Sequence, residues 1–168
     1  MRRTTILETT AVLLGVGLSL FAKGGMVRIT IRGEHLANPI EIATPEALAR
    51  FHAGAGPGNF AIVNGSRIPN YKSQSFIVDW SRQIARPPQG MKVYEIAFSM
   101  EVGRTYTVRY ALDSSTNQGY VYIPGEADPE YAENTRMIAR GVEGNWFIAW
   151  SEWERLANPL IAAANRMP

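Results

Sequence analysis

Residues 91–123 read MKVYEIAFSMEVGRTYTVRYALDSSTNQGYVYI, and this stretch decides the fold. It contains three runs in which apolar and polar residues alternate, separated by residues typical of turns. In the first run Tyr94, Ile96 and Phe98 share one face, because successive side chains of a strand point to opposite sides. Gly103 suits the first turn, because glycine adopts positive φ without steric cost. The pattern predicts a three-stranded antiparallel meander with one apolar face.

Apolar runs outside the meander predict further strands. They lie at 27–31, 39–42, 60–63, 76–80 and 146–150. In the earliest of them Val27, Ile29 and Ile31 are expected on the core side. Residues 67–75 are polar, and we expect a loop there.

Two helix starts contain proline. Thr44 and Pro45 predict an N-cap and first residue of a helix that ends near Phe51. Asp128, also followed by proline, predicts a short helix to about Asn134.

The C-terminal segment predicts a broken helix over residues 151–164. Ser151 and Glu154 have the spacing of a capping box. Pro159 is expected to interrupt the helix, with Asn158 capping its second half. The residues expected to pack on the sheet are Trp153, Leu156, Leu160 and Ile161.

Together these elements predict an α+β fold: an antiparallel sheet, with the meander at its centre and the N-terminal strands added, packed by short helices. The chain has 168 residues, a length that suits one domain. We expect residues 1–22 to be a signal peptide or N-terminal anchor and residues 23–168 to be a single α+β domain.

Composition excludes some function classes. The formal net charge is +2 and no basic stripe is present, which argues against nucleic-acid binding. There is no cysteine, so disulfides, thiolate metal sites and cysteine nucleophiles are excluded. The histidines, His35 and His52, lack metal-ligand spacing, and we expect no metal and no cofactor.

The N-terminus resembles a bacterial export signal. Arg2 and Arg3 precede an apolar run, AVLLGVGLSLFA, at residues 11–22. The run is shorter than the roughly 20 residues of a membrane-spanning helix, and cleavage after Ala22 is plausible. We therefore predict a periplasmic or secreted protein. The alternatives are an uncleaved membrane anchor and a buried N-terminal helix.

Two loops resemble known binding motifs. Residues 54–58 read GAGPG, but they follow a predicted helix and Pro57 lacks an N–H, so a helix-ending turn is favoured over a phosphate loop. Residues 113–119 begin like a calcium loop but lack the glycine and glutamate spacing of an EF-hand. A polar hairpin loop is favoured there.

The acidic residues Glu126 and Asp128 form the core of a cluster in the C-terminal half. Paired carboxylates can hydrolyse glycosidic bonds, although helix-cap and surface roles are favoured here. Aromatic residues crowd the same half, and their flat faces and polar tips suit sugar or peptide stacking as well as core packing. The candidate ligand-binding aromatics are Tyr120, Tyr122, Trp146, Trp150 and Trp153.

Four short pieces carry a resemblance. They read AKGG, VRITIRGEHLANPIEI, GYVYIPG and GVEGNWF, at residues 22–25, 27–42, 119–125 and 141–147. In these pieces the chain resembles a loose group of exported bacterial proteins with no assigned function. The resemblance implies export and supplies no catalytic residues.

The function we predict is that of a non-enzymatic interaction module of the envelope or extracellular space. The partner would be an envelope protein or a glycan, and we expect no nucleic-acid partner. One alternative is a glycan-directed hydrolase using the acidic residues, and another is a membrane-anchored subunit of a larger complex.

Overall fold

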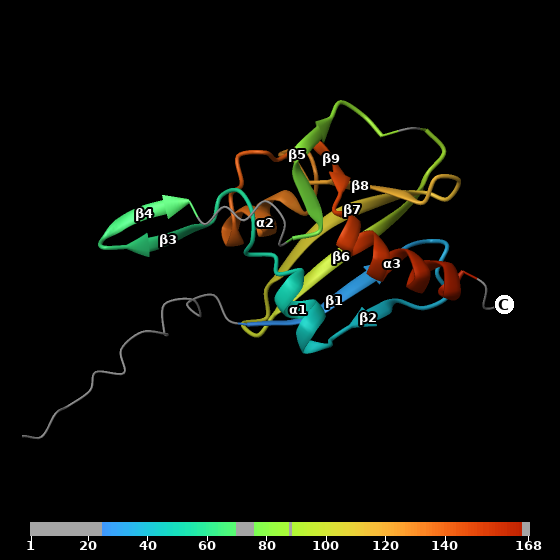
Figure 1. Ribbon diagram of the computed structural model, residues 1–168, viewed down its shortest axis with the longest axis horizontal. Helices are drawn as coiled ribbons and strands as arrows, with labels where there is room; N and C mark the ends of the chain where they lie inside the picture. The colour runs from blue at the N-terminus through green and yellow to red at the C-terminus, as the bar shows by residue number, and fades with distance from the viewer. Residues whose placement is uncertain (1–24, 70–75, 88, 166–168) are drawn as a thin grey trace, which may run out of the picture.

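A seven-stranded sheet forms the body of the molecule, and a separate two-stranded sheet projects from it (Figure 1). The computed structural model describes residues 25–69, 76–87 and 89–165. The strand order is β2-β1-β6-β7-β8-β9-β5, and all neighbouring strands are antiparallel. These strands are β1 (Met26–Arg32), β2 (Ile40–Ile42), β5 (Val78–Ile84), β6 (Lys92–Met100), β7 (Thr105–Asp113), β8 (Gln118–Tyr122) and β9 (Trp146–Ala149). The predicted α+β fold is confirmed. The signal predicted at residues 1–22 lies outside the described residues.

The predicted meander is β6, β7 and β8, at the centre of the sheet. Tyr94 pairs with Tyr110, which pairs in turn with Val121, so these three side chains share one face. That face is fully buried, and its innermost residues are Tyr94, Ile96, Phe98, Tyr106, Val108, Tyr110 and Val121, each 0% exposed. Gly103 has the predicted positive φ, 74°, in the turn between β6 and β7.

Two helices cover the apolar face, α1 (Pro45–Arg50) and α3 (Ser151–Ala164) (Figure 1). Trp153 of α3 meets the ring of Tyr110 edge-on, with ring centroids 6.3 Å apart. The third helix, α2 (Tyr131–Met137), packs against β7. The opposite face of the sheet therefore has no cover from α1 or α3.

The pairing of β1 departs from the prediction at its first residues. The register with β6 shifts between Met26 and Arg28, so the strand contains an extra residue at Val27. Val27 is 44% exposed, whereas Ile29 and Ile31 are 0% exposed. The predicted core position of Val27 is wrong, because a bulge turns alternation out of phase.

Residues 60–69 form the projecting hairpin, β3 (Phe60–Val63) and β4 (Ser66–Pro69). Asn64 and Gly65 join the strands with φ values of 50° and 77°, the combination that a type I′ turn requires. The loop predicted from residue 67 is therefore wrong for residues 67–69, and residues 70–75 lie outside the described residues. The strand predicted at 76–80 begins two residues later and runs to Ile84.

The predicted start of α1 is confirmed, with Thr44 as N-cap and proline at the first position. The helix predicted from Asp128 begins later, with Glu130 as N-cap and Tyr131 as first residue. The reason is that the Asp128 carboxylate accepts the backbone N–H of Gly125 at 2.8 Å and so closes a turn instead of capping a helix.

Three expectations about the C-terminal helix are wrong. The helix α3 is continuous through Pro159, which lies on its exposed side, where water can serve the carbonyl that proline leaves without a donor. The capping box is absent, because Trp150 is the N-cap and Glu154 accepts the backbone N–H of Gly119 at 2.6 Å. Asn158 is buried in the helix interior instead of capping.

The remaining packing predictions for α3 are mostly confirmed. Trp153 and Ile161 are buried at 0% and 1% exposure, and Leu156 packs against the core at partial exposure. Leu160 is 37% exposed, so its predicted core position is wrong. The buried Asn158 explains part of the exposure of Leu160. Asn158 accepts the Tyr110 hydroxyl at 2.6 Å, so the side of α3 that carries Asn158 faces the core.

Candidate functional site

The five candidate aromatic residues lie in three different environments. Tyr120, Tyr122 and Trp146 are partly exposed on the sheet face opposite α1 and α3. Trp150 is partly exposed in a groove between α1 and α3. Trp153 is 0% exposed and packs against the rings of Phe51 and Tyr110, so it is a core residue and is removed from the candidate set.

Cross-strand pairing brings Tyr122 and Trp146 together. They are direct partners in β8 and β9, with ring centroids 5.0 Å apart and planes at 36°. Arg109 is the partner of Tyr122 in β7, and its guanidinium lies 5.6 Å from the centre of the tyrosine ring. We call the set of Arg109, Tyr122, Asp128, Glu130 and Trp146 the sheet-face cluster.

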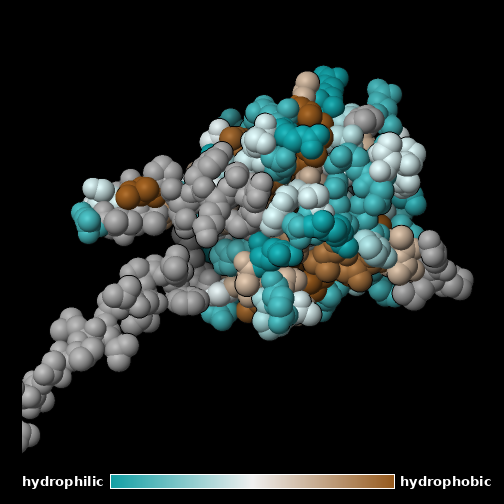
Figure 2. Space-filling view, in the orientation of Figure 1, coloured by the Kyte–Doolittle hydropathy of each residue, from teal (hydrophilic) through white to brown (hydrophobic). Residues whose placement is uncertain are grey.

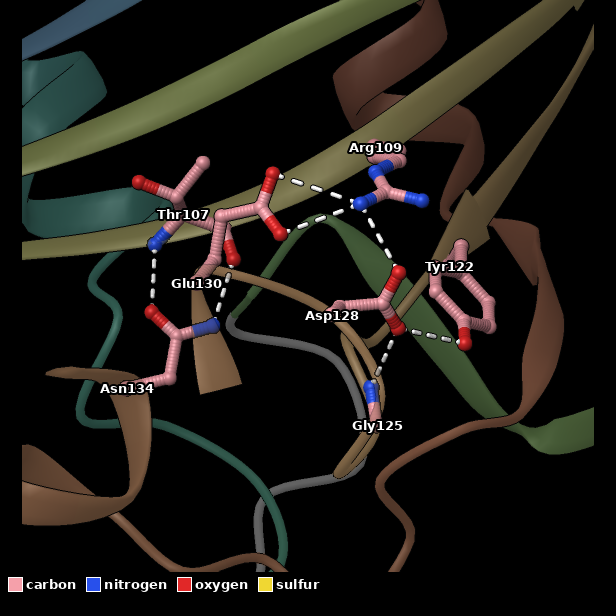
Figure 3. Close-up of polar contacts among 7 residues, drawn as sticks. All are labelled: Thr107, Arg109, Tyr122, Gly125, Asp128, Glu130 and Asn134. Carbon is pink, nitrogen blue, oxygen red and sulfur yellow. Dashed lines mark hydrogen bonds and ion pairs between the residues drawn. The ribbon is translucent and has the colours of Figure 1, made fainter. Parts of the chain in front are cut away.

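Asp128 is the hub of the sheet-face cluster (Figure 3). Its Oδ2 accepts the Tyr122 hydroxyl and the Gly125 N–H, both at 2.8 Å, and its Oδ1 lies 2.8 Å from Nη2 of Arg109. Burial alone would raise the Asp128 pKa, but these hydrogen bonds and the guanidinium charge together hold the pKa below its usual value. Asp128 is therefore ionised at neutral pH.

Arg109 is held by two carboxylates. Nη2 lies 2.8 Å from Asp128 and 3.0 Å from Glu130. Burial tends to lower the Arg109 pKa, but Glu130 and Asp128 outweigh it and raise the pKa. Burial and the hydrogen bond to Asp128 also raise the pKa of Tyr122. The cluster thus presents fixed charges, one cation and two anions, beside aromatic rings.

Asn134 attaches α2 to the sheet beside this cluster (Figure 3). Its Oδ1 accepts the Thr107 N–H at 2.8 Å and its Nδ2 donates to the Thr107 carbonyl at 2.6 Å. Pairing of β8 with β7 begins only at Arg109, so the amide of Asn134 replaces a neighbouring strand at Thr107. Asn134 is 2% exposed, and it holds the loop that carries Asp128 and Glu130 against the sheet.

The two predicted acidic residues, Glu126 and Asp128, lie in different environments. Asp128 contacts three partners, Tyr122, Gly125 and Arg109, and has a lowered pKa. Glu126 is exposed. The acid of a glycosidic hydrolysis is a carboxyl group with a raised pKa, and the lowered pKa of Asp128 does not suit that role.

Sequence reasoning missed a second arginine, Arg140, which is 4% exposed. Its Nε donates to the Tyr106 hydroxyl at 2.7 Å, its Nη1 donates to the carbonyls of Ala55 at 2.8 Å and Pro57 at 3.1 Å, and its Nη2 donates to the carbonyl of Ala53. Three rings surround the guanidinium, with centres 4.9, 5.1 and 4.8 Å away; they belong to Phe76, Trp80 and Tyr106. We call these partners the Arg140 cage.

The Arg140 cage explains the glycine-rich GAGPG segment. The segment presents carbonyl oxygens to a cation, which is the opposite polarity to a phosphate loop with its N–H groups. Gly56 and Gly58 have φ values of 94° and 78°, and a side chain at Gly58 would collide with the Ala139 backbone. No local pattern marks Arg140, because its partners come from distant segments of the chain.

Two other sequence candidates prove to be local structure. Asp113 accepts hydrogen bonds from Ser115 and Thr116, and these lower its pKa to about 2. The predicted polar hairpin loop between β7 and β8 is thereby confirmed. The ring of His52 accepts the Gly54 N–H at 2.9 Å, and burial lowers the pKa of this histidine. Among the described residues no three His, Cys, Asp or Glu side chains are grouped as metal ligands.

A groove beside Trp150 has a volume of about 920 Å³. Its apolar lining comes from Ala47, Phe51, Trp150 and Leu156, and charged side chains stand at its rim. Within the described ranges, no helix combines the length and apolar character needed to cross a membrane. No family model, curated protein or solved structure matches the chain, so the candidate site rests on its geometry.

Proposed function

We propose that the chain is a non-enzymatic interaction module, exported to the envelope or beyond, that binds its partner through the sheet-face cluster and Tyr120. The observation that carries this proposal is the placement of Tyr122 and Trp146, 5.0 Å apart, beside the Arg109–Asp128 ion pair on a face that α1 and α3 leave open. Aromatic and arginine side chains are enriched where proteins bind partners.

The rigidity of the cluster supports binding over catalysis. Arg109, Asp128 and Tyr122 fix one another by hydrogen bonds and an ion pair of 2.8 Å. Prior ordering lowers the entropic cost of association. Neither Asp128 nor Tyr122 is poised to exchange a proton near neutral pH, since the Asp128 pKa is lowered and the Tyr122 pKa is raised.

Two partner chemistries suit the cluster, an envelope protein and a glycan. Tyrosine and tryptophan rings stack on sugars or on apolar side chains, and carboxylate oxygens accept hydroxyl or amide protons. Tyr120 extends the aromatic surface by two register positions along β8, opposite Ile148 of β9.

Binding is tested with Trp146→Ala and Tyr120→Ala. Wild-type protein is cross-linked in native envelope extract and, in parallel, titrated with isolated envelope glycans. We expect each variant to weaken binding by at least about tenfold, because buried aromatic anchors carry most of a binding free energy. The matched control is Trp150→Ala, a partly exposed tryptophan in the groove between α1 and α3. Failure of the wild type to bind either partner, or equal binding by Trp146→Ala, would contradict the proposal.

Export is tested separately by intact mass and cell fractionation. The proposal expects a mass that begins near Lys23, in a periplasmic or secreted fraction, because the apolar run ends at Ala22. A full-length mass in the membrane fraction would contradict the export of a free module and would indicate an anchored subunit.

A further inference from the structure

The groove between α1 and α3 combines an apolar floor with a charged rim. Trp150 and Leu156 are partly exposed in it, beside Ala47. Figure 2 shows apolar surface gathered over α3, bordered by hydrophilic side chains. The volume, about 920 Å³, lies in the range of sites for small molecules.

Two guanidinium groups converge on one carboxylate at the rim. Nη1 of Arg50 lies 2.8 Å from Oε2 of Glu152, and Nη2 of Arg155 contacts Oε1 of the same residue. The arginine side chains are 57% and 67% exposed, whereas that of Glu152 is 25% exposed. Each guanidinium has five N–H donors in a planar fork, so an exposed arginine can pair with a second acceptor besides Glu152.

The internal contact shows which chemical group the rim accepts. A carboxylate, that of Glu152, is already bound between Arg50 and Arg155, and it lines the same groove as Trp150. Glu46 also lines the groove, but no ion pair joins it to either arginine among the described residues. A ligand that adds one carboxylate meets unused donors of two cations, and its apolar part meets the floor.

We propose that this groove binds a small amphipathic carboxylate. The carboxylate pairs with Arg50 and Arg155 at the rim, and the apolar body lies on Trp150 and Leu156. This site is on the opposite side of the sheet from the sheet-face cluster and is independent of the function proposed above.

The test uses laurate, below its micelle-forming concentration, titrated into the full chain by calorimetry. We expect saturable binding with one site, and we expect the uncharged analogue dodecanol to bind at least about tenfold more weakly, because charge-assisted pairs with arginine are lost. Absence of laurate binding at millimolar concentration, or equal binding of dodecanol, would overturn the proposal.

Variants separate this site from non-specific uptake. The double variant Arg50→Gln, Arg155→Gln should weaken laurate binding by at least about tenfold. Glu152→Gln removes the competing carboxylate and should tighten binding about threefold, the size expected for an exposed ion pair. A merely structural ion pair would predict no such gain. The matched control is Arg136→Gln, an α2 arginine that is 74% exposed and paired with Glu133.

The control should bind laurate like the wild type. If Arg136→Gln weakens binding as much as the double variant, attraction by overall charge is the explanation and the groove is excluded. Thermal melting of every variant is measured alongside. Exposed ion pairs contribute little to stability, so a melting shift that accompanies lost binding in the double variant would assign the loss to folding. In that case the Glu152→Gln variant decides the question. If it binds laurate no more tightly than the wild type does, the proposed site is rejected.

Discussion

Two arginines, Arg140 and Arg109, both lie beside aromatic rings, but their guanidinium groups have different kinds of hydrogen-bond partner. Arg140 is 4% exposed, and within the part of the chain that the structure describes its guanidinium donates to neutral oxygens, three backbone carbonyls and one tyrosine hydroxyl. Arg109 has a side chain that is 34% exposed and pairs with Asp128 and Glu130. None of the ion pairs formed by the described residues includes Arg140.

The difference shows how burial selects the partner of a charge. A buried carboxylate would add a second desolvation cost to that of the guanidinium, whereas backbone carbonyls must find donors in any case. Near the surface, Asp128 and Glu130 keep part of their hydration, so pairing them with Arg109 has a smaller desolvation cost. Arg140 therefore fixes the packing of the core, while Arg109 organises a surface that a partner can reach.

The largest expected effect is at Arg140. Arg140→Met keeps much of the side-chain volume but leaves the carbonyls of Ala53, Ala55 and Pro57 without their donor. We expect the free energy of unfolding to fall by about 3–5 kcal/mol. Urea denaturation measures this value. The matched variant Arg109→Met should cost less than half as much, and equal losses at both sites would break the comparison.

The second largest loss of stability is expected at Gly58, which follows Pro57 of the Arg140 cage. Gly58→Ala combines a left-handed φ of 78° with a collision against the Ala139 backbone. We expect a loss of about 2–4 kcal/mol in the free energy of unfolding. Gly65→Ala is the control, because Gly65 has nearly the same φ, 77°, and no atom within 4 Å of the added carbon. A loss at Gly65 as large as that at Gly58 would show that the cage imposes no special constraint.

A moderate effect is expected at Asp128 in the sheet-face cluster. Its folded pKa lies below the unfolded value of 3.8, so its stabilising contribution is complete above that value and is lost as pH falls through the folded pKa. Asp128→Asn should cost about 1–2 kcal/mol at neutral pH. Denaturation at pH 7 and in strong acid should show the gap between wild type and variant closing. A gap that stays constant with pH would contradict the assigned pKa direction.

The smallest effect has the opposite sign and concerns Glu154. Burial raises its pKa, although the Gly119 N–H opposes this. A folded pKa above the unfolded value of 4.5 means that the fold gains stability as pH falls from neutrality through the folded pKa. We expect wild type to gain less than about 1 kcal/mol relative to Glu154→Gln between pH 7 and pH 4.5. Denaturation of both proteins across that range checks it, and a gain by the variant would reverse the assignment.

Local signals in the sequence predicted the elements that depend on neighbouring residues. The alternation in residues 91–123 gave the meander, and Thr44 with Pro45 gave the start of α1. Each of these signals lies within a few positions of the structure that it specifies, so no knowledge of distant segments was needed.

The features that were missed depend on distant partners. Glu154 has the spacing for a capping box, but Gly119 offers a backbone N–H and takes the carboxylate instead. Asn158 resembles a cap until Tyr110 is brought against it. Among the site residues, Tyr122 and Trp146 were predicted as candidates, whereas the contacts of Tyr122 with Trp146 and with Arg109 needed the strand register. Periodicity carries no information about such register.

The placement of β5 at the far edge of the sheet, beside β9, has a consequence for the order of folding. Val78 and Trp80 of β5 are buried at 0% and 7% exposure, but the strand pairs with residues 146–149. During synthesis, the apolar side chains of β5 have no partner strand until most of the remaining chain, including β9, has been made. Closing so long a loop is slow, and it leaves an unpaired apolar strand exposed in the meantime. The apolar strand β5 therefore stays exposed to aggregation until β9 has been synthesised and can pair with it.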